Sequence, residues 1–289
     1  MRCIPEMIRS WFVVPASGQV SMPDRDAIRD GIEYRTLPVC LMMVMLLFLP
    51  GIVRAEDKPA EKPPEPPSVV LCNPLSMKLG RTMKMTVRGL RLDQSTEVRC
   101  GLEGATVKIL KKGTASVPRN FEAARVGDTE MVIEVTVPKT VTATETNIAV
   151  VSPGGESKPF RILISDPAAI VQDKEANDGF GQSQVVDPPC LIEGSIHTGL
   201  NVDVFAISAK AGQAVNARVT AHTLGSALDS ILTLFDEHGR IIKTADDSDT
   251  PDAVLDIVVP RSGRYLLVLQ DAHDQGGSTH PYRLEITAK

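Results

Sequence analysis

Short runs of alternating apolar and polar residues dominate the chain from residue 68 to its C-terminus, and they restrict it to a β-rich fold. Met83, Met85 and Val87 alternate with polar residues, and the run 131–137 (MVIEVTV) repeats the pattern. A period of two places successive side chains on opposite faces of a strand. Turn residues separate the runs, and no stretch carries the sustained 3.6-residue period of a helix. We therefore predict an antiparallel β-sandwich of about 100 residues over 68–165.

A second block of predicted strands occupies residues 171–289. The runs that carry it are 191–196, 204–209, 214–221, 231–236, 253–259, 264–271 and 282–288. Seven strands in about 120 residues again favour an antiparallel sandwich, here a jelly-roll-like one. The predicted fold class is therefore all-β, with two antiparallel β-sandwich domains in succession.

Residues 37–55 have the pattern of a cleavable signal sequence. An uncharged stretch over 37–53 is followed by small residues at the positions that a signal peptidase reads. The stretch is shorter than the roughly 20 apolar residues of a membrane span, and Pro38, Pro50 and Gly51 interrupt it. A retained membrane anchor and a buried core segment are the alternatives. We expect a bacterial protein that is secreted, periplasmic or held at the cell envelope, with no membrane attachment after cleavage.

The segments on either side of this signal are predicted to carry no fold of their own. Residues 1–36 mix acidic and basic side chains, unlike the short basic start of a signal sequence. We interpret them as a disordered extension or as residues upstream of the true start codon. Residues 56–67 (EDKPAEKPPEPP) hold five prolines in twelve positions. Such tracts stay extended as semi-rigid spacers, so we predict a proline-rich linker there.

Composition and charge restrict the kinds of partner that the protein is expected to bind. The chain has 31 Lys and Arg residues against 36 Asp and Glu, a net charge of −5. It therefore lacks the basic surface of nucleic-acid-binding proteins. Aromatic residues make up 4%, and the single tryptophan, Trp11, lies outside the predicted domains, so base-stacking platforms are poorly supplied. We expect no nucleic-acid partner. The charge is also uneven, because residues 56–170 carry +2 and residues 171–289 carry −8.

Loose motifs mark the first predicted sandwich. They are Pro74, Gly80 ahead of a strand, and the runs 87–90 (VRGL) and 148–157 (IAVVSPGGES). On these motifs residues 69–164 resemble the TIG/IPT family of immunoglobulin-like domains. The resemblance implies an Ig-like sandwich with a structural or adhesive role. The family has no catalytic residues to transfer to this chain.

An ordered series of motifs runs through almost the whole second block. The motifs are 191–196 (LIEGSI), 202–205 (VDVF), 209–213 (AKAGQ), 224–229 (LGSALD), 236–239 (DEHG), 246–247 (DD), 259–265 (VPRSGRY) and 282–286 (YRLEI). On this series residues 171–289 resemble the bacterial pre-peptidase C-terminal domain. That family occurs at the C-terminal side of secreted proteases and in many other secreted proteins. It is also similar to the calcium-dependent collagen-binding module of clostridial collagenases.

A run of acidic and amide side chains near the start of the second block holds the best candidate metal ligands. Asp173, Glu175 and Asn177 would present oxygen atoms on one face of an extended segment. Such oxygens suit Ca²⁺, which takes roughly six to eight oxygen ligands. An EF-hand is rejected, because Asp178 replaces the glycine of its sixth position and Gln184 the glutamate of its twelfth. The alternative is a solvated acidic linker that binds no metal.

The resemblance to the collagenase module extends this set of candidate ligands. Its calcium-binding N-terminal segment and the body of its domain both contribute positions that can be matched here. The matched residues are Asp173, Glu175, Asn177, Asp178, Asn201 and Asp203. The sequence departs from the module's pattern, since position 173 is an aspartate rather than the longer glutamate and position 201 is an asparagine. The resemblance implies a Ca²⁺ site at these residues.

Other polar clusters are weaker candidates. The acidic run 246–252 (DDSDTPD) is typical of a solvated loop. Residues 271–274 (DAHD) with His280 offer nitrogen ligands for zinc, but the glycines at 276 and 277 predict a hairpin loop there. The sequence holds no HExxH, GxSxG, CxxC or phosphate-binding glycine motif. We therefore expect no enzymatic activity.

Three cysteines lie beyond the signal sequence. Cys72 and Cys100 share the inward parity of their predicted strands, so a disulfide between them and a pair of buried thiols are both open. Cys190 has no evident partner.

These observations favour a non-enzymatic binding or accessory protein, secreted or held at the cell envelope. Its second sandwich would be stabilised by Ca²⁺, and its partner would be a protein or polymer outside the membrane. The alternative is an accessory, secretion or substrate-docking partner of a secreted peptidase, or a remnant of one.

Overall fold

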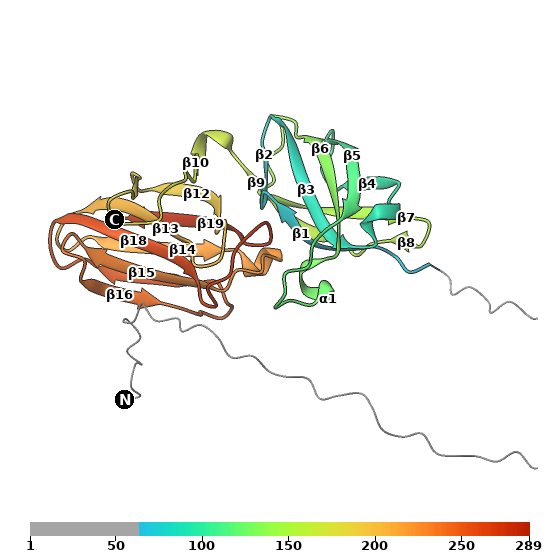
Figure 1. The fold of residues 1–289 in the computed structure, drawn as a ribbon. Coiled ribbons are helices and arrows are strands. Elements are labelled where there is room, and N and C mark those ends of the chain that lie inside the picture. The colour runs from blue at the N-terminus through green and yellow to red at the C-terminus, as the bar shows by residue number, and fades with distance from the viewer. Residues whose placement is uncertain (1–63) are drawn as a thin grey trace, which may run out of the picture. The chain divides into compact units, whose positions relative to one another are not determined.

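The computed structural model describes residues 64–289, which form two β-sandwiches in succession (Figure 1). The predicted all-β fold class is confirmed, since strands between Ser68 and Ala288 carry nearly all of the regular structure. The predicted extension at 1–36, the signal sequence at 37–55 and most of the linker at 56–67 lie outside the described residues. Among residues 64–289, no helix has the length and apolar character of a membrane span.

The first sandwich pairs two sheets of immunoglobulin type. One sheet has the order β1-β3-β6-β5, with strands Ser68–Asn73, Thr82–Leu90, Thr129–Thr136 and Thr106–Thr114. The other has the order β2-β9-β7-β4, with strands Ser76–Lys78, Phe160–Ser165, Glu145–Ser152 and Glu97–Cys100. A two-residue strand, β8 (Gly155–Glu156), pairs with β7. These orders correspond to the A-B-E-D and C-F-G sheets of an immunoglobulin domain.

Alternating burial explains why these segments are strands. In β6, Met131, Ile133 and Val135 are fully buried, and the residues between them are only partly buried. The buried faces of both sheets meet in one apolar core. Cys72 lies in this core, and Cys72 and Cys100 are free thiols in the structure. Burial raises the pKa of both thiols above the ordinary value for cysteine, as an apolar environment predicts.

The second sandwich consists of two five-stranded sheets. One has the order β10-β12-β19-β14-β17, with strands Ile170–Gln172, Cys190–Ser195, Pro281–Ala288, Ala214–Thr220 and Val254–Val258. The other has the order β11-β13-β18-β15-β16, with strands Gln184–Val185, Val202–Ala209, Gly263–Asp271, Ser230–Asp236 and Ile241–Ala245. From β12 to β15, consecutive strands lie in alternate sheets, which is how a jelly-roll-like chain encloses its core.

Three edge pairings are parallel, which differs from the prediction of purely antiparallel sandwiches. They join β2 to β9, β10 to β12 and β11 to β13. The added strands β2, β10 and β11 have only two or three residues and lie at the ends of their sheets. Strands this short carry no readable period of two, because the pattern needs at least four residues. The positions of these short strands depend instead on the path that the chain takes between the sheets.

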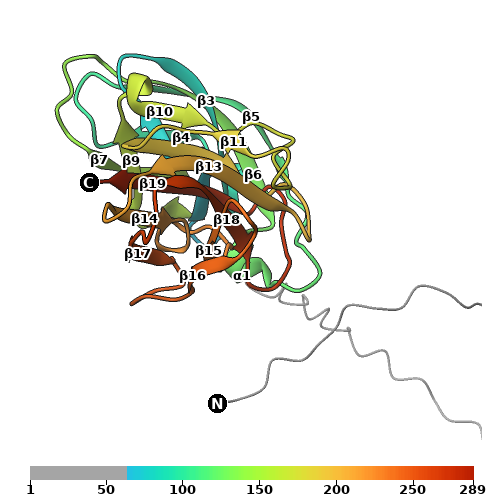
Figure 2. The same cartoon turned by 90° about the vertical axis from the view of Figure 1, so that its left-hand side faces the viewer.

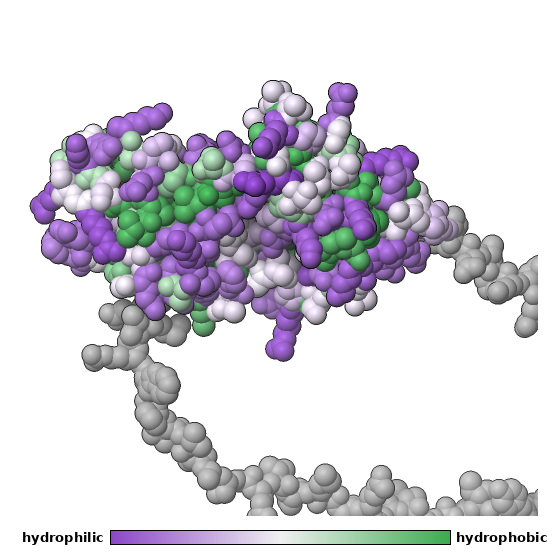
Figure 3. All heavy atoms as spheres, turned by 90° about the horizontal axis from the view of Figure 1, so that it is seen from above, coloured by the Kyte–Doolittle hydropathy of each residue, from purple (hydrophilic) through white to green (hydrophobic). Residues whose placement is uncertain are grey.

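The second sandwich has an apolar core between its two sheets and a smaller apolar cluster on the outer face of one sheet. Phe205 and Tyr282 are the largest fully buried side chains of its core. On the opposite face of β13 and β18, a second cluster contains Val204, Ala206, Leu266 and Val268, with Phe235 against it. The Phe180 ring meets Phe235 edge-on, with ring centroids 5.0 Å apart. Figure 3 shows mostly polar side chains on the surface, with apolar side chains gathered in separate patches.

Candidate metal centre

The segment 173–183, called the strap below, joins β10 at the edge of one sheet to β11 at the edge of the other (Figure 2). Backbone hydrogen bonds hold it against the sandwich. The Asp173 N–H donates to the Glu193 carbonyl at 3.1 Å, and the Val204 N–H donates to the Asn177 carbonyl at 3.0 Å. The polar side chains of the strap are therefore placed against β12 and β13.

Asp173 and Asn177 fix each other inside the strap. The Asn177 Nδ2 atom donates to Asp173 Oδ1 at 2.9 Å, and Asn177 is 1% exposed. The other oxygen of each side chain, Oδ2 of Asp173 and Oδ1 of Asn177, is buried and has no hydrogen-bond partner. Buried polar atoms in folded proteins are nearly always partnered, so these two oxygens need an explanation.

Asp203, on β13, adds two further oxygens to this group. Its side chain is 0% exposed, and neither carboxylate oxygen has a hydrogen-bond partner. The Tyr282 hydroxyl lies beside Asp173 and Asp203, close enough to interact with both, but no pair of these atoms has hydrogen-bond geometry. A buried carboxyl group without a partner is disfavoured in its charged form unless a cation neutralises it.

Burial and mutual repulsion dominate the electrostatics of the group. Burial first, and then the charge of Asp173, raise the pKa of Asp203 to about 8. Burial also raises the pKa of Asp173 and of Glu175 above the ordinary carboxyl values. The pKa of Tyr282 is raised by burial and by the two neighbouring aspartates. A bound cation would offset both the burial cost and the repulsion.

Glu175 and His197 form the exposed side of the same group. The His197 Nδ1 atom lies 2.5 Å from Oε1 of Glu175. One ligand atom from each of Asp173, Glu175 and His197 falls within 4.8 Å of the others. His197 therefore lies against Glu175 on the exposed side of the group, while Oδ2 of Asp173 is buried.

Asp178 and Asn201 are paired with each other. The Asn201 Nδ2 atom donates to Asp178 Oδ1 at 2.7 Å, and Asn201 Oδ1 accepts the His197 N–H at 3.0 Å. The amide of Asn201 is thus occupied on both sides. Of the six candidate ligands from the sequence, Asp173, Glu175 and Asn177 lie together, through the 4.8 Å group with His197 and the hydrogen bond between Asn177 and Asp173. Asp203 is near enough for the charge of Asp173 to add to burial in raising its pKa, but it does not belong to that 4.8 Å group. The other two form a hydrogen-bonded pair next to this group.

The donor set fits a hard cation. The unpartnered buried atoms are carboxylate and amide oxygens of Asp173, Asn177 and Asp203. Ca²⁺ takes such oxygens, whereas zinc favours nitrogen and sulfur. These residues would hold the ion between the strap and β13.

Sequence reasoning missed His197 of this group. It also missed two residues that shape the group, Tyr282 and Gly194. They are paired opposite each other on β19 and β12. A Cβ atom at position 194 would lie 2.5 Å from the Tyr282 hydroxyl and 2.6 Å from the Asp173 Cβ, so only glycine leaves room for both. Both residues belong to motifs that carry the resemblance to the pre-peptidase C-terminal domain, which is the one signal that could have found them.

The acidic side chains of the second run, 246–252, lie in two different environments. Asp252 is 5% exposed and accepts three successive backbone N–H groups at the start of the 3₁₀ turn η3 (His222–Leu224), at 2.7 to 3.2 Å. It therefore acts as a structural cap. Asp246 and Asp247 are exposed and lie near Asp229, with one oxygen of each within 4.8 Å of the others.

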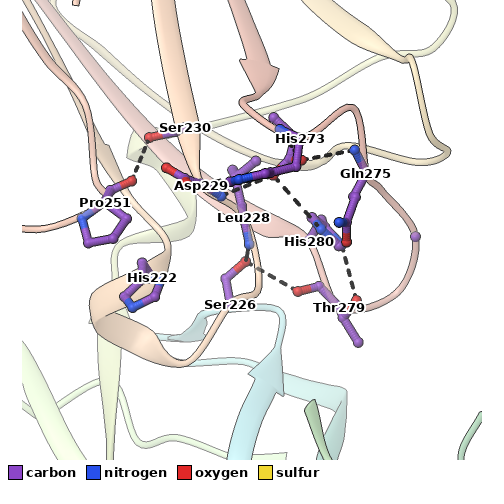
Figure 4. A network of polar contacts seen from close by, with 12 residues as sticks. His222, Ser226, Leu228, Asp229, Ser230, Pro251, His273, Gln275, Thr279 and His280 are labelled. Atoms are coloured by element: carbon purple, nitrogen blue, oxygen red, sulfur yellow. Dashed lines mark hydrogen bonds and ion pairs between the residues drawn. The ribbon is translucent and has the colours of Figure 1, made fainter. Parts of the chain in front are cut away.

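Figure 4 shows the polar network around His273 and His280. His273 is exposed, and its Nδ1 atom lies 3.4 Å from Asp229 Oδ2. His280 is fully buried, and its Nδ1 atom is hydrogen-bonded to the Thr279 hydroxyl at 3.0 Å. Its Nε2 atom lies 4.0 Å from Asp271 Oδ2 and has no hydrogen-bond partner. The Asp271 carboxylate accepts the backbone N–H groups of Asp229, His273 and Gln275 at 2.9 to 3.0 Å. Asp271 thus holds the loop in place and is poorly free to bind zinc.

Comparison with known proteins gives one relative by sequence. No family model matches the chain. A probable subtilase-type serine protease of Deinococcus radiodurans is 38% identical over 100 residues, which are 34% of this chain. The chain spans only 14% of the length of that protease.

Solved structures that match part of the chain include a domain of a collagenase and a periplasmic lysozyme inhibitor. The pre-peptidase C-terminal domain of a collagenase from Bacillus anthracis matches 36% of this chain and 94% of that domain, with 14% identity and a TM-score of 0.31. The chain contains a region similar to a pre-peptidase C-terminal domain. The resemblance predicted from the motifs of residues 171–289 is to this same kind of domain, and the TIG/IPT resemblance of the first sandwich stays a prediction. PliG of Aeromonas hydrophila, a periplasmic inhibitor of g-type lysozyme, matches 37% of this chain and 99% of that protein, with 19% identity and a TM-score of 0.29.

Proposed function

We propose that the protein is a non-catalytic accessory module that works outside the cytoplasmic membrane and docks a protein or polymer there. Ca²⁺ binds between the strap and β13 and stabilises the second sandwich. The observation that carries this proposal is the group of buried, unpartnered oxygens on Asp173, Asn177 and Asp203. Three residues from two separate parts of the chain contribute these oxygens, and a bound cation would offset the cost of burying them.

The strap gives such an ion a structural role. Its two ends adjoin β10 and β11, which belong to different sheets, and its first half holds Asp173 and Asn177. An ion bound to the strap and to Asp203 therefore joins the edges of both sheets. Because the ligands meet only in the folded chain, binding stabilises the folded state by mass action, about 2.7 kcal/mol at a hundredfold excess over Kd.

A role beside a secreted peptidase is the second candidate function. It is supported by the 100 residues that are 38% identical to a subtilase-type serine protease. The matched stretch is a small part of that protease, so the proposed role is docking, secretion or substrate presentation rather than peptide hydrolysis. The absence of a catalytic motif from the sequence supports the same view.

Thermal melting of the full chain tests the calcium proposal. We expect the melting temperature to rise by several degrees in millimolar Ca²⁺ relative to a chelator, and Asp203→Asn to abolish this rise while leaving the chain folded. Asp246→Asn removes the same charge from the other acidic cluster and serves as the control, with an unchanged calcium effect. Equal melting temperatures with Ca²⁺ and with chelator would overturn the proposal, and so would a calcium effect that Asp246→Asn removes and Asp203→Asn retains.

A further inference from the structure

A pocket at the turn between β15 and β16 gathers positive charge in an otherwise acidic domain. The pocket has a volume of about 320 Å³ and is lined by that turn and by the loop that leads into β18. Residues 171–289 contain five arginines within a net charge of −8. Three of them, Arg240, Arg261 and Arg264, line this one pocket.

Two of the three guanidinium groups, those of Arg261 and Arg264, are not paired with a carboxylate. Arg240 is neutralised by Asp236, whose Oδ2 atom lies 2.7 Å from Arg240 Nη2. Arg264 donates only to the neutral Ser183 hydroxyl, at 2.6 Å. Arg261 has no side-chain partner among residues 64–289. Glu237, the other carboxylate of the lining, lies 3.9 Å from His238.

The loop that presents these arginines is held in place. The Tyr265 hydroxyl donates to the Arg261 carbonyl at 2.7 Å, and the Ser262 hydroxyl accepts the Ala211 N–H at 2.9 Å. Tyr265 is itself buried in the core of the sandwich. The guanidinium groups of Arg261 and Arg264 therefore extend from an ordered loop and from the start of β18, which lowers the entropy lost when they bind an anion.

An open strand edge begins at the same pocket. Ile241 and Ile242, the first residues of β16, line the pocket, and Ile241 is 64% exposed. In the described part of the chain, β16 is the last strand of its sheet and pairs only with β15. Unpaired backbone groups on an edge strand can accept an extended peptide as an additional strand.

We propose that this pocket and the edge of β16 bind an extended acidic segment of a partner polypeptide, which adds to the sheet as a strand. Carboxylates of the segment pair with Arg261 and Arg264, since a guanidinium matches a carboxylate in two parallel hydrogen bonds. Apolar side chains of the segment cover the exposed Ile241. This inference rests on the proposed function, because it names the chemistry of the partner that the module docks.

An acidic polysaccharide offers the same carboxylates and is the competing occupant. The peptide is favoured by the strand edge beside the arginines, because a polysaccharide has no backbone N–H and C=O ladder to pair with β16. An experiment that tests whether binding needs those backbone groups therefore distinguishes a peptide from a polysaccharide.

Fluorescence anisotropy of the full chain in Ca²⁺ tests the proposal. The probe is a labelled octapeptide of alternating glutamate and valine, and its matched controls are the glutamine version and a version with alternate backbone nitrogens methylated. We expect saturable binding of the first peptide only. Arg261→Ala and Arg264→Ala should each weaken it by about tenfold, as loss of a hydrogen bond to a charged group predicts. Arg218→Ala, which removes an arginine from β14 away from the pocket, should leave it unchanged.

Several results would overturn the inference. They are equal binding of the glutamate and glutamine peptides, full binding of the methylated peptide, or displacement of the probe by polygalacturonate at concentrations where unlabelled peptide has no effect. The melting experiment with and without Ca²⁺ is run on the same preparation. A calcium effect without peptide binding therefore rejects this inference and leaves the proposed function standing, whereas peptide binding without a calcium effect does the reverse.

Discussion

Among single residues, Asp203 differs most from an ordinary side chain in water. Its carboxylate is fully enclosed, has no hydrogen-bond partner and has a pKa raised to about 8 by burial and by Asp173. A buried carboxylate without a partner destabilises a fold, and it is retained where a ligand compensates for it. Asp203 is therefore the residue to change first when calcium binding is tested.

His280 leads to a prediction about pH. Burial lowers the pKa of this imidazole, although the nearby Asp271 charge acts in the opposite direction. Because the unfolded chain binds a proton at about pH 6.5 and the folded chain resists it, lowering the pH below this value costs stability. We predict that the free energy of unfolding of the wild type falls between pH 7 and pH 5 more steeply than that of His280→Gln.

Urea denaturation at several pH values measures this difference. The comparison between the two proteins removes the contributions of the other titrating groups, which both proteins share. Identical slopes for wild type and His280→Gln in this window would show that the imidazole protonates in the folded state as it does in water.

At the scale of elements, the pairing of β12 with β19 determines the shape of the metal centre. Gly194 lies opposite Tyr282, and the space of the missing side chain is occupied by the Tyr282 hydroxyl and by Asp173. We predict that Gly194→Ala lowers stability by about 2 kcal/mol, the usual cost of overpacking, and also weakens the calcium-induced rise in melting temperature.

The control for this prediction is Gly113→Ala, in β5. A Cβ atom at position 113 meets nothing within 4 Å, so this variant should melt close to the wild type. Differential scanning calorimetry with Ca²⁺ and with chelator reports both quantities. Gly194→Ala behaving like Gly113→Ala would contradict the role assigned to this close approach.

The strands also show how much of the fold could be predicted from the sequence. Strands of five or more residues with one buried face, such as β6 and β14, were predictable because burial imposes a period of two on them. The edge strand β5 was missed because its residues, from Thr106 to Thr114, are mostly exposed on both faces. The strands β10 and β11 were missed because they are short and depend on the path of the strap.

The residues of the candidate site were likewise only partly predictable from the sequence. The spacing of Asp173, Glu175 and Asn177 along the chain could be noticed in the sequence, and the family resemblance pointed to Asp203. The contribution of Tyr282 could not be found by spacing, because it arises from a pairing of strands that are distant in sequence.

At the scale of the whole molecule, the two sandwiches differ in charge. Residues 171–289 carry −8 and residues 56–170 carry +2. Excess negative charge destabilises a compact domain through self-repulsion, and bound cations reduce it. The proposed calcium site and the proposed peptide-binding pocket would be two places where an acidic domain gains attractive interactions, one with a metal ion and one with a partner.

The central claim is that the second sandwich is a scaffold assembled around Ca²⁺. Isothermal titration calorimetry of the full chain with Ca²⁺, repeated with Mg²⁺ and with Asp203→Asn, tests it most directly. The account predicts saturable heat for Ca²⁺, much weaker binding of Mg²⁺, which demands a smaller and more rigid site, and no saturable heat for the variant. No calcium binding by the wild type, or equal binding by wild type and Asp203→Asn, would contradict it.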